Sequence, residues 1–448
     1  MPQNRGDVHD PVFEIRDPIY GFVKLTGAEI DIINTPTFQR LRDIRQLAMG
    51  HMVYPGANHT RFEHSIGCVH VSTNMLELLK EREGKNKRPT FQQAFSADEQ
   101  GYDRGKKILR LASLLHDVGH PPFSHSGEGL LSKGVSHEVM SVKMIRDTEI
   151  AGCIHAHYET AGISVEDVIA VATRPSLAKS VEYRGSWNLF LNQILTGELG
   201  SDRIDYLLRD AHHSGQMGGN FDYVKLLNAM TVLQQPKRDG EAWVLGLDEG
   251  GWLVAEQMVV ARYMMYVALY FHKTKRIYEI HLEDFMREYL PKRCLPTNLK
   301  KYIALTDSKI VTAIHEAASK KSKKGHAHAR RFMDRSHLRM AREVVLADNF
   351  LLGEDGRRYW NRNRFDNLAE HVRVTYGYDP LLVDTPLLVP GQRCSHLTPR
   401  YWCYWMERYE ISTISLRLSE GCRRKYREVG YIVKKSTKWR SEKRATPS

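Results

Sequence analysis

Long apolar runs are absent from this sequence of 448 residues. A membrane-spanning helix needs roughly eighteen or more consecutive apolar residues, and no such stretch occurs, so we expect no membrane span. The amino-terminus lacks the apolar core of a signal peptide, and we expect a cytoplasmic protein. Cysteine is also sparse, because the six cysteines are scattered and form no CxxC pair. This pattern favours free thiols in a reducing compartment over a disulfide framework.

Negative charge is outnumbered. The net charge is +12 and the sequence pI is about 9.3, although the contents of 42% hydrophobic and 26% charged residues are ordinary for a globular protein. Basic residues are dense in the carboxy-terminal tail, residues 436–448. Such an excess attracts polyanions, and the tail therefore favours contact with nucleic acid, whereas a merely solvated surface is the alternative.

Helical periodicity dominates what is present, and we predict a mainly α fold. Thr35-Pro36 is typical of a helix start, and apolar residues follow it at helical spacing through Leu47. A long helix is predicted over 251–280. Two short apolar runs, 231–233 and 243–245, flank a turn and predict a small β-hairpin.

Changes in composition suggest the domain boundaries. We expect an amino-terminal tail at 1–14 and a helical domain at 15–318, which contains a polar surface insertion at 81–107. A smaller α+β carboxy-terminal lobe is expected at 330–435, and the basic tail at 436–448. A charged, linker-like break at 319–325 separates the two larger parts. Strands of the lobe are predicted at 372–376, 387–389 and 411–414.

The most informative feature is the adjacent pair His116 and Asp117, which ends an apolar helical stripe just before Gly119. Adjacent imidazole and carboxylate groups offer nitrogen and oxygen ligands to one cation, although a helix-end hydrogen bond is the alternative for an isolated pair. His64 upstream and Asp202 downstream complete an H…HD…D set. These donors suit a divalent transition metal, with Mn, Fe, Zn, Ni and Co not distinguished. Such a metal polarises a phosphoryl oxygen and activates water.

Longer motifs around these residues resemble the HD-domain deoxynucleoside triphosphate (dNTP) triphosphohydrolases. They are found at 17–21, 35–42, 54–64, 116–125, 202–210, 220–223 and 270–273. The resemblance extends from about residue 15 to about residue 315, whereas the carboxy-terminal lobe matches poorly. It implies an HD-domain helical core and hydrolysis of dNTPs to a deoxynucleoside and inorganic triphosphate, with additional Mg²⁺ accompanying the triphosphate.

The resemblance also implies roles for individual residues. The metal at the α-phosphate is held by His64, His116, Asp117 and Asp202. The catalytic pocket residues are His120, His125, His137 and Glu128, the last standing where the family has Asp. The phosphate contacts are Arg61, Arg203, Tyr206, Arg262 and Lys273. The sugar contacts are Gln46 and Asp210 at the 3′-hydroxyl, and Leu47 and Tyr270 beneath C2′.

Regulation is implied in the same way. Regulated relatives carry an Asp that recognises a guanine activator between subunits, and Asn34 stands at that position here, whereas Gln39 and Arg42 remain. The resemblance therefore implies a homo-oligomer, a dimer or tetramer, with a regulatory nucleotide that is not strictly GTP. It further suggests depletion of dNTP pools in defence against phage.

Two other functions fit parts of the sequence. One is an HD-type phosphodiesterase or nucleotidase, against which the sugar pocket argues. The other is a nucleic-acid-binding or nucleotide-sensing protein with a residual HD core, against which the complete metal set argues.

Overall fold

The computed structural model describes residues 12–85, 88–175, 177, 185–237 and 240–337, and beyond them the backbone of short strands. The chain divides into two compact units. The first unit comprises Met1–Tyr270 and Tyr278–Met333, and the second comprises Phe271–Ile277 and Asp334–Ser448.

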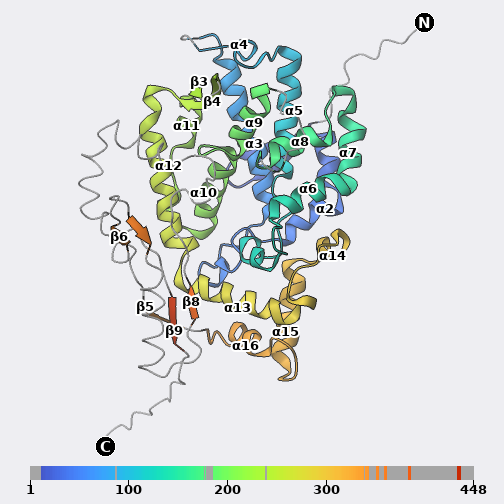
Figure 1. The fold of residues 1–448 in the computed structure, drawn as a ribbon, viewed down its shortest axis with the longest axis vertical. Coiled ribbons are helices and arrows are strands. Elements are labelled where there is room, and N and C mark those ends of the chain that lie inside the picture. The colour runs from blue at the N-terminus through green and yellow to red at the C-terminus, as the bar shows by residue number, and fades with distance from the viewer. Residues whose placement is uncertain are drawn as a thin grey trace, which may run out of the picture. The chain divides into compact units, whose positions relative to one another are not determined.

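The first unit is mainly α-helical, which confirms the predicted fold class (Figure 1). Its elements before the π-helical turn described below are β1 (Val12–Asp17), β2 (Gly21–Thr26), α1 (Gly27–Ile33), α2 (Pro36–Gln39), α3 (Arg61–Glu81), α4 (Phe91–Phe95), α5 (Glu99–Leu115), α6 (His137–Asp147), α7 (Glu149–Tyr158), α8 (Val165–Ala172), α9 (Gly185–Thr196), α10 (Ser201–Ser214), α11 (Tyr223–Ala229), β3 (Met230–Lys237), β4 (Gly240–Leu247) and α12 (Trp252–Met265).

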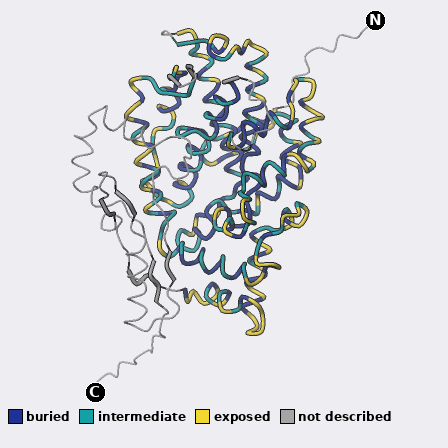
Figure 2. The backbone as a smooth tube through the Cα atoms, in the orientation of Figure 1, coloured by how far each residue is buried: buried dark blue, intermediate teal, exposed yellow. Residues whose placement is uncertain are grey.

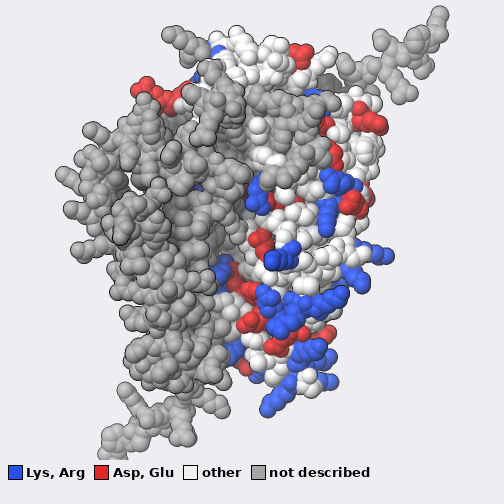
Figure 3. All heavy atoms as spheres, in the orientation of Figure 1, with Lys and Arg blue, Asp and Glu red and all other residues white. Residues whose placement is uncertain are grey.

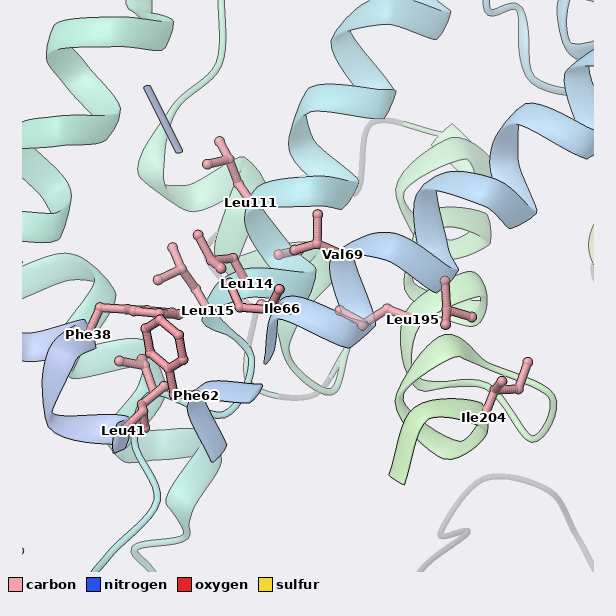
Figure 4. Packing of buried hydrophobic residues seen from close by; sticks show 14 of the residues in the cluster. Phe38, Leu41, Phe62, Ile66, Val69, Leu111, Leu114, Leu115, Leu195 and Ile204 are labelled. Carbon is pink, nitrogen blue, oxygen red and sulfur yellow. The ribbon is translucent and has the colours of Figure 1, made fainter. Parts of the chain in front are cut away.

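Helix α3 is the centre of this unit. It packs against both α5 and α10, and most of its residues are buried, as Figure 2 shows. Figure 4 shows part of the buried apolar cluster around these helices; the residues labelled there are Phe38, Leu41, Phe62, Ile66, Val69, Leu111, Leu114, Leu115, Leu195 and Ile204. The core therefore fixes the ends of α3, α5 and α10 relative to one another.

The amino-terminal residues form an antiparallel hairpin of β1 and β2, in which Asp17 pairs with Gly21. This hairpin was not predicted from the sequence. The turn is stabilised because Asp17 Oδ1 accepts hydrogen bonds from the backbone N–H groups of Ile19 and Tyr20, at 2.8 and 3.1 Å. Gly21 has φ +80°, a conformation that favours glycine.

The helix predicted at Thr35-Pro36 begins as expected, with Thr35 Oγ1 accepting a hydrogen bond from the N–H of Phe38 at 3.3 Å. It is short, however. After Gln39 the chain continues as one 3₁₀ turn, Arg40–Asp43, and then leaves the helical conformation. The apolar residues that recur after Thr35 are buried, but they do not belong to one continuous helix.

Residues 81–107, expected as a surface insertion, contribute to the core. Phe91 of α4 and Tyr102 of α5 are 1% and 6% exposed, and their rings stack with centroids 5.7 Å apart. The ring of Trp187 lies 5.4 Å from that of Phe91. The polar composition of this segment did not indicate that Phe91 and Tyr102 would be buried and would attach the segment to the core.

The predicted β-hairpin is confirmed as the antiparallel pair β3 and β4. The long helix predicted over 251–280 is instead broken. Helix α12 passes into a π-helical turn, Tyr266–Tyr270, and α13 (Lys273–Tyr289) follows. Neither glycine nor proline marks this break in the sequence. It places the Tyr270 side chain beside α10, as described below.

Three helices end the first unit: α14 (Leu299–Ile303), α15 (Asp307–Ser319) and α16 (His326–Met333). The predicted break at 319–325 falls between α15 and α16. Over the described part of the face in Figure 3, Lys and Arg side chains lie among Asp and Glu side chains.

Beyond Phe271–Ile277 and residues 334–337, the second unit is described only in short strands. Strands β5 (Arg339–Arg342), β9 (Tyr431–Lys434) and β8 (Leu382–Asp384) form one antiparallel sheet in that order, and β6 (Phe350–Leu352) pairs with β7 (Arg358–Trp360). The strands predicted at 372–376, 387–389 and 411–414, and the basic tail, lie outside the described residues. Among the residues described, no helix is long and apolar enough to cross a membrane.

Candidate functional site

The four predicted metal ligands converge from three segments of the chain. His64 lies in the first turn of α3, His116 caps α5 and is followed by Asp117, and Asp202 lies in the first turn of α10. His64 Nε2 is 3.4 Å from Asp117 Oδ2 and 3.2 Å from Asp202 Oδ1. His116 Nε2 is 3.6 and 3.8 Å from the same two oxygens. Donor atoms at these separations surround a space that suits a metal–ligand distance of about 2.0–2.2 Å.

Hydrogen bonds on the far side of each imidazole aim the correct nitrogen into this space. His116 Nδ1 donates to the carbonyl oxygen of Ser113 at 2.8 Å, and His64 Nδ1 donates to Asp205 Oδ2 at 2.8 Å. Each Nε2 therefore carries the free lone pair. His116 Nε2 is buried and has no hydrogen-bond partner among the described residues. The donor set thus fits a divalent metal, and the 30% exposure of the Asp202 side chain leaves one side open.

Asp205 is itself held by Arg209, whose Nε and Nη2 donate to its two oxygens at 2.9 Å each. Burial opposes the charge of Asp205, but Arg209 and the hydrogen bond from His64 lower its pKa to about 2. Arg209 also pairs with Asp17 Oδ2 at 2.9 Å, and both carboxylates and the guanidinium are almost fully buried. The amino-terminal hairpin thereby supports a metal ligand through two ion pairs. The sequence indicated only that Asp202 and Asp205 share a helix face.

Gly67 allows α3 to approach this ion pair. A Cβ atom at residue 67 would collide with Asp205 Oδ1 and Arg209 Nη2. We expect Gly67→Ala to destabilise the protein by about 1–3 kcal/mol through overpacking and to lower its metal content. Gly152→Ala is the matched control, because a Cβ there meets no atom within 4 Å. Denaturant unfolding and metal analysis of both variants test this; equal stability of the two would contradict it.

Arg61, predicted to contact phosphate, lies against the metal ligands instead of in open space. It is 2% exposed, its Nη1 pairs with Asp117 Oδ2 and its Nε donates to Ser124 Oγ at 2.8 Å. Burial raises the pKa of Asp117, but Arg61 and two neighbouring histidines hold it well below its usual value. Asp117 is therefore a carboxylate, as a metal ligand must be.

Cys68 is a donor that the sequence did not single out. Its Sγ lies 3.6 and 3.7 Å from the two ring nitrogens of His64, close enough to join His64, His116 and Asp202 in one ligand group. Burial raises the pKa of its thiol to about 12. A protonated thiol is a poor metal ligand, so Asp117 fits the fourth position better.

The predicted catalytic residues form a second cluster beside the first. The rings of His120 and His137 stack with centroids 3.9 Å apart. Glu128 Oε1 accepts from His137 Nδ1 and lies 3.3 Å from His125 Nδ1. His120 Nδ1 lies 3.2 Å from Asp117 Oδ1 and so joins the two clusters.

The electrostatics of this cluster differ from residue to residue. Burial lowers the pKa of His120 well below its usual value, so its ring is neutral near pH 7. Burial raises the pKa of Glu128, but His125 and His137 outweigh this and hold it well below its usual range. The side chain of His125 is 56% exposed, whereas that of His137 is 19% exposed. The cluster therefore joins one buried neutral imidazole to two imidazoles that share a carboxylate.

Two of the predicted sugar contacts meet directly. Tyr270 donates from its hydroxyl to Asp210 Oδ2 at 2.7 Å, while Asp210 Oδ1 is 2.7 Å from His59 Nε2. The sequence missed His59, whose ring stacks on that of His213 with centroids 4.5 Å apart. The backbone N–H of Gln46 donates to the carbonyl of His59, at 3.1 Å.

Gln46 and Leu47 are the other two predicted sugar contacts. Gln46 Oε1 is buried and has no hydrogen-bond partner among the described residues, which leaves an acceptor to be satisfied. Leu47 is 5% exposed.

Two of the predicted phosphate contacts beyond Arg61, namely Arg203 and Arg262, are joined by one carboxylate. Glu198 lies 3.2 Å from Arg203 Nη2 and 3.1 Å from Arg262 Nη1. Arg203 Nη1 also donates to the carbonyl of Thr196 at 2.6 Å. Burial raises the pKa of Tyr206, which keeps its hydroxyl protonated. Lys273 belongs to the second unit, and its role stays a prediction.

The residues predicted for regulation lie at the junction of α1 and α2. Asn34 is exposed, and Gln39 Nε2 donates to the carbonyl of Ile33 at 2.8 Å. Arg42 donates to Gln39 Oε1 at 2.8 Å and lies over the ring of Phe62, 3.6 Å from its centroid. An exposed guanidinium in this position is available to an anion.

Asp307 is a further residue that sequence analysis missed. It is 1% exposed, and its two oxygens accept hydrogen bonds from the N–H groups of Arg45 and Phe123, at 3.0 and 2.7 Å. It thereby joins the segment after α2 to the loop that carries His120 and His125. Its only sequence signal is the helix start at Thr306, which many unrelated acidic residues share.

Comparison with known proteins agrees with this geometry. Residues 61–208 match the HD domain family, and residues 221–385 match the HD associated region. The chain is 33% identical over 263 residues to the uncharacterized protein MJ1154 of Methanocaldococcus jannaschii, with 59% of this chain and 47% of that protein covered. It is 32% identical over 295 residues to the human deoxynucleoside triphosphate triphosphohydrolase SAMHD1, with 61% and 44% covered.

A solved structure is similar over more of its length. A hypothetical protein from Aquifex aeolicus superposes with a TM-score of 0.63 at 29% identity, covering 84% of this chain and 86% of that one. The chain spans about half the length of the curated relatives it matches. Two segments of the chain therefore match the HD domain and the HD associated region, and the chain is similar to a named dNTP triphosphohydrolase.

Proposed function

We propose that this protein hydrolyses dNTPs to a deoxynucleoside and inorganic triphosphate. The observation that carries the proposal is the meeting of His64, His116, Asp117 and Asp202, with donor atoms 3.2–3.8 Å apart, in the same HD core as the Asp210–Tyr270 pair. The first group suits a divalent metal, and the second suits a deoxyribose. The similarity to the human deoxynucleoside triphosphate triphosphohydrolase supports the same substrate class.

His64, His116, Asp117 and Asp202 would hold a divalent metal, which would polarise the α-phosphoryl group as a Lewis acid and lower the pKa of water. The chain's own residues do the rest. Asp205 and the Ser113 carbonyl hold the two imidazoles in one orientation. Arg61 places a positive charge beside Asp117, where negative charge develops on the phosphoryl oxygens.

Proton transfer falls to the histidine cluster. Water attacks the α-phosphorus and its oxygen stays with the triphosphate, so the bond that breaks joins the α-phosphorus to the 5′-oxygen of the deoxynucleoside. That 5′-oxygen is the leaving group and needs a proton as the bond breaks. His125 and His137 share Glu128, and one of them, protonated, serves as the acid. His120 is neutral and positions the cluster through its contacts with Asp117 and His137.

Product analysis tests the proposal. The full chain is incubated with each dNTP and each NTP in the presence of Mn²⁺ or Mg²⁺, and the products are separated by chromatography. We expect deoxynucleoside and intact triphosphate in equal amounts. Release of monophosphate with pyrophosphate, or of phosphate alone, would instead indicate the nucleotidase or phosphodiesterase. Absence of hydrolysis with retained nucleotide or nucleic-acid binding would indicate a sensing protein with a residual HD core.

Replacing Asp205 tests how the metal ligand His64 is oriented. We expect Asp205→Asn to lower metal affinity and turnover by about 10–100-fold, because an amide holds the imidazole of His64 less strongly than a carboxylate does. Asp103→Asn, on the exposed face of α5, is the control and should leave both unchanged. Metal titration and initial rates measure the effect; unchanged metal affinity in Asp205→Asn would remove Asp205 from the site.

Regulation is proposed on the cluster around Arg42. A nucleotide bound there between subunits of a homo-oligomer would stabilise the assembly, by roughly 2.7 kcal/mol at a hundredfold excess over Kd. Because Asn34 replaces the guanine-reading Asp, we expect activation by a dNTP and no strict need for GTP. The rate on one dNTP is measured with and without each other nucleotide, together with mass by light scattering. Strict GTP dependence contradicts the Asn34 argument; full activity of one dNTP at low concentration without a change of mass contradicts the regulatory site.

Two broader roles follow from the same proposal. Hydrolysis of dNTPs in the cytoplasm would lower the supply of DNA precursors, which fits defence against phage. The basic tail would add affinity for nucleic acid, and a steep salt dependence of that affinity is its expected mark.

A further inference from the structure

A third group of ligand-type side chains lies far along the chain from the HD residues, where α13 meets α16. His281 and Asp284 are three residues apart on α13 and therefore lie on one face of that helix, and His328 lies on α16. One donor atom from each of the three lies within 4.8 Å of the others. Figure 1 shows α13 and α16 near α15, in the last helical part of the first unit.

His328 lies between two carboxylates of α13. Its Nδ1 faces Asp284 Oδ2 at 4.0 Å, and its Nε2 faces Glu288 Oε1 at 3.7 Å. Both distances are too long for a hydrogen bond, and Nδ1 is buried without a hydrogen-bond partner among the described residues. Glu288 therefore acts on His328 through its negative charge, which favours the orientation that leaves Nδ1 toward Asp284.

A backbone hydrogen bond holds the side chain of Glu288 in place. Its Oε2 accepts the N–H of Gly325 at 2.7 Å, just before α16 begins. Gly325 has φ +76°, and a Cβ there would lie 2.5 Å from the ring of Phe285. The turn into α16 is thus held tightly, and it sets where His328 enters the group.

Burial and charge favour a cation in this group. His281 is 1% exposed, and the side chains of His328 and Asp284 are 21% and 39% exposed, so the group opens to solvent on one side. Glu283 and Glu288 add negative charge near Asp284, against Arg287 on the same helix and Arg331 on α16.

We propose that His281, Asp284 and His328 bind a structural divalent transition-metal ion, with Glu288 orienting His328. Two imidazoles and one carboxylate suit Zn²⁺, Co²⁺ or Mn²⁺ better than Ca²⁺ or Mg²⁺. The ion joins α16, a helix of 8 residues, to α13. Such a short helix has little stability of its own, so the ion is expected to hold it in place.

Metal stoichiometry tests the site separately from hydrolysis. The full-length protein is stripped with a chelator and titrated with Zn²⁺. We expect two ions per chain for the wild type, one for His328→Ala, one for His116→Ala, and none bound tightly by the double variant. The exposed His315 of α15 provides the control His315→Ala, which should still bind two. Two ions in His328→Ala, or a single wild-type ion that is lost in His116→Ala, would overturn the proposal.

Hydrogen exchange distinguishes the metal site from a simple ion pair of a protonated His328 with Asp284 and Glu288. Zn²⁺ should slow exchange of the backbone amides of 326–333 in the wild type and in His116→Ala, and leave them unchanged in Asp284→Asn. If Zn²⁺ does not change the exchange rates of these amides in the wild type, the result favours the ion pair and refutes the metal site. Because His116→Ala lacks the proposed HD metal, loss of the proposed hydrolysis and loss of this site are distinguishable.

Discussion

His116→Ala is expected to abolish turnover while the protein stays folded. The imidazole supplies one of four donors, and its Nδ1 donates to the Ser113 carbonyl. Its removal leaves Asp117 paired with Arg61 and Asp202 beside His64. Replacing residues behind metal ligands commonly costs about 10–100-fold, and loss of a ligand itself should cost more. Turnover, metal content and circular dichroism of the purified variant measure the outcome.

The control and the companion variant sharpen this test. His155→Ala removes an exposed imidazole of α7 and should leave turnover and metal content unchanged. Asp117→Ala should also abolish turnover, but it leaves Arg61 buried without its carboxylate, and a loss of stability should accompany it. A His116→Ala variant with full metal content and a near-normal rate would end the metal assignment.

Ribonucleotides are expected to be poor substrates. Leu47 and Tyr270 are proposed to pack beneath the sugar, and Tyr270 already gives its hydroxyl to Asp210, so a 2′-hydroxyl would be buried without a partner. Burying an unpaired hydroxyl costs about 1–3 kcal/mol. Because about 1.4 kcal/mol corresponds to a factor of ten, kcat/KM should be roughly 5–150-fold lower for the ribonucleotide than for the deoxynucleotide. Comparable turnover of GTP and dGTP would contradict this expectation.

Two substitutions at Tyr270 separate shape from hydrogen bonding. Tyr270→Ala removes the ring and should narrow the gap between dGTP and GTP. Tyr270→Phe keeps the ring but loses the hydrogen bond to Asp210, so it should retain the discrimination while raising KM for both. If the gap persists in Tyr270→Ala, another residue excludes the 2′-hydroxyl.

The convergence of the proposed metal ligands could be predicted from sequence because each lies at a helix end within a short motif. His116 and Asp117 are adjacent, and the order of His64 and Asp202 around them completes the pattern. The residues that orient them could not be predicted in the same way. Asp205 reaches His64 across 141 residues of sequence, and Asp307 reaches Phe123 across 184. Only tertiary packing decides such contacts.

The fold shows the same division. Thr35-Pro36 and the hairpin of β3 and β4 have local signals, and both are present. The break at Tyr266–Tyr270 has none, because its residues are compatible with a continuous helix and tertiary packing overrides that preference. The amino-terminal hairpin was missed because its turn at Asp17 is stabilised by a side chain and because Arg209, far along the chain, holds it.

The ion pair of Asp17 with Arg209 also has a consequence for how the protein is made. Asp17 leaves the ribosome long before Arg209 is synthesised, so the hairpin cannot take up its final partner during early elongation. Contacts between residues distant in sequence form slowly, because a long loop must close first. The support behind His64 therefore completes only after α10 has been added. A protein synthesised without β1 would lack Asp17, and the buried guanidinium of Arg209 would lose one of its two carboxylates. Metal binding would then depend on whether the amino-terminal strand is present.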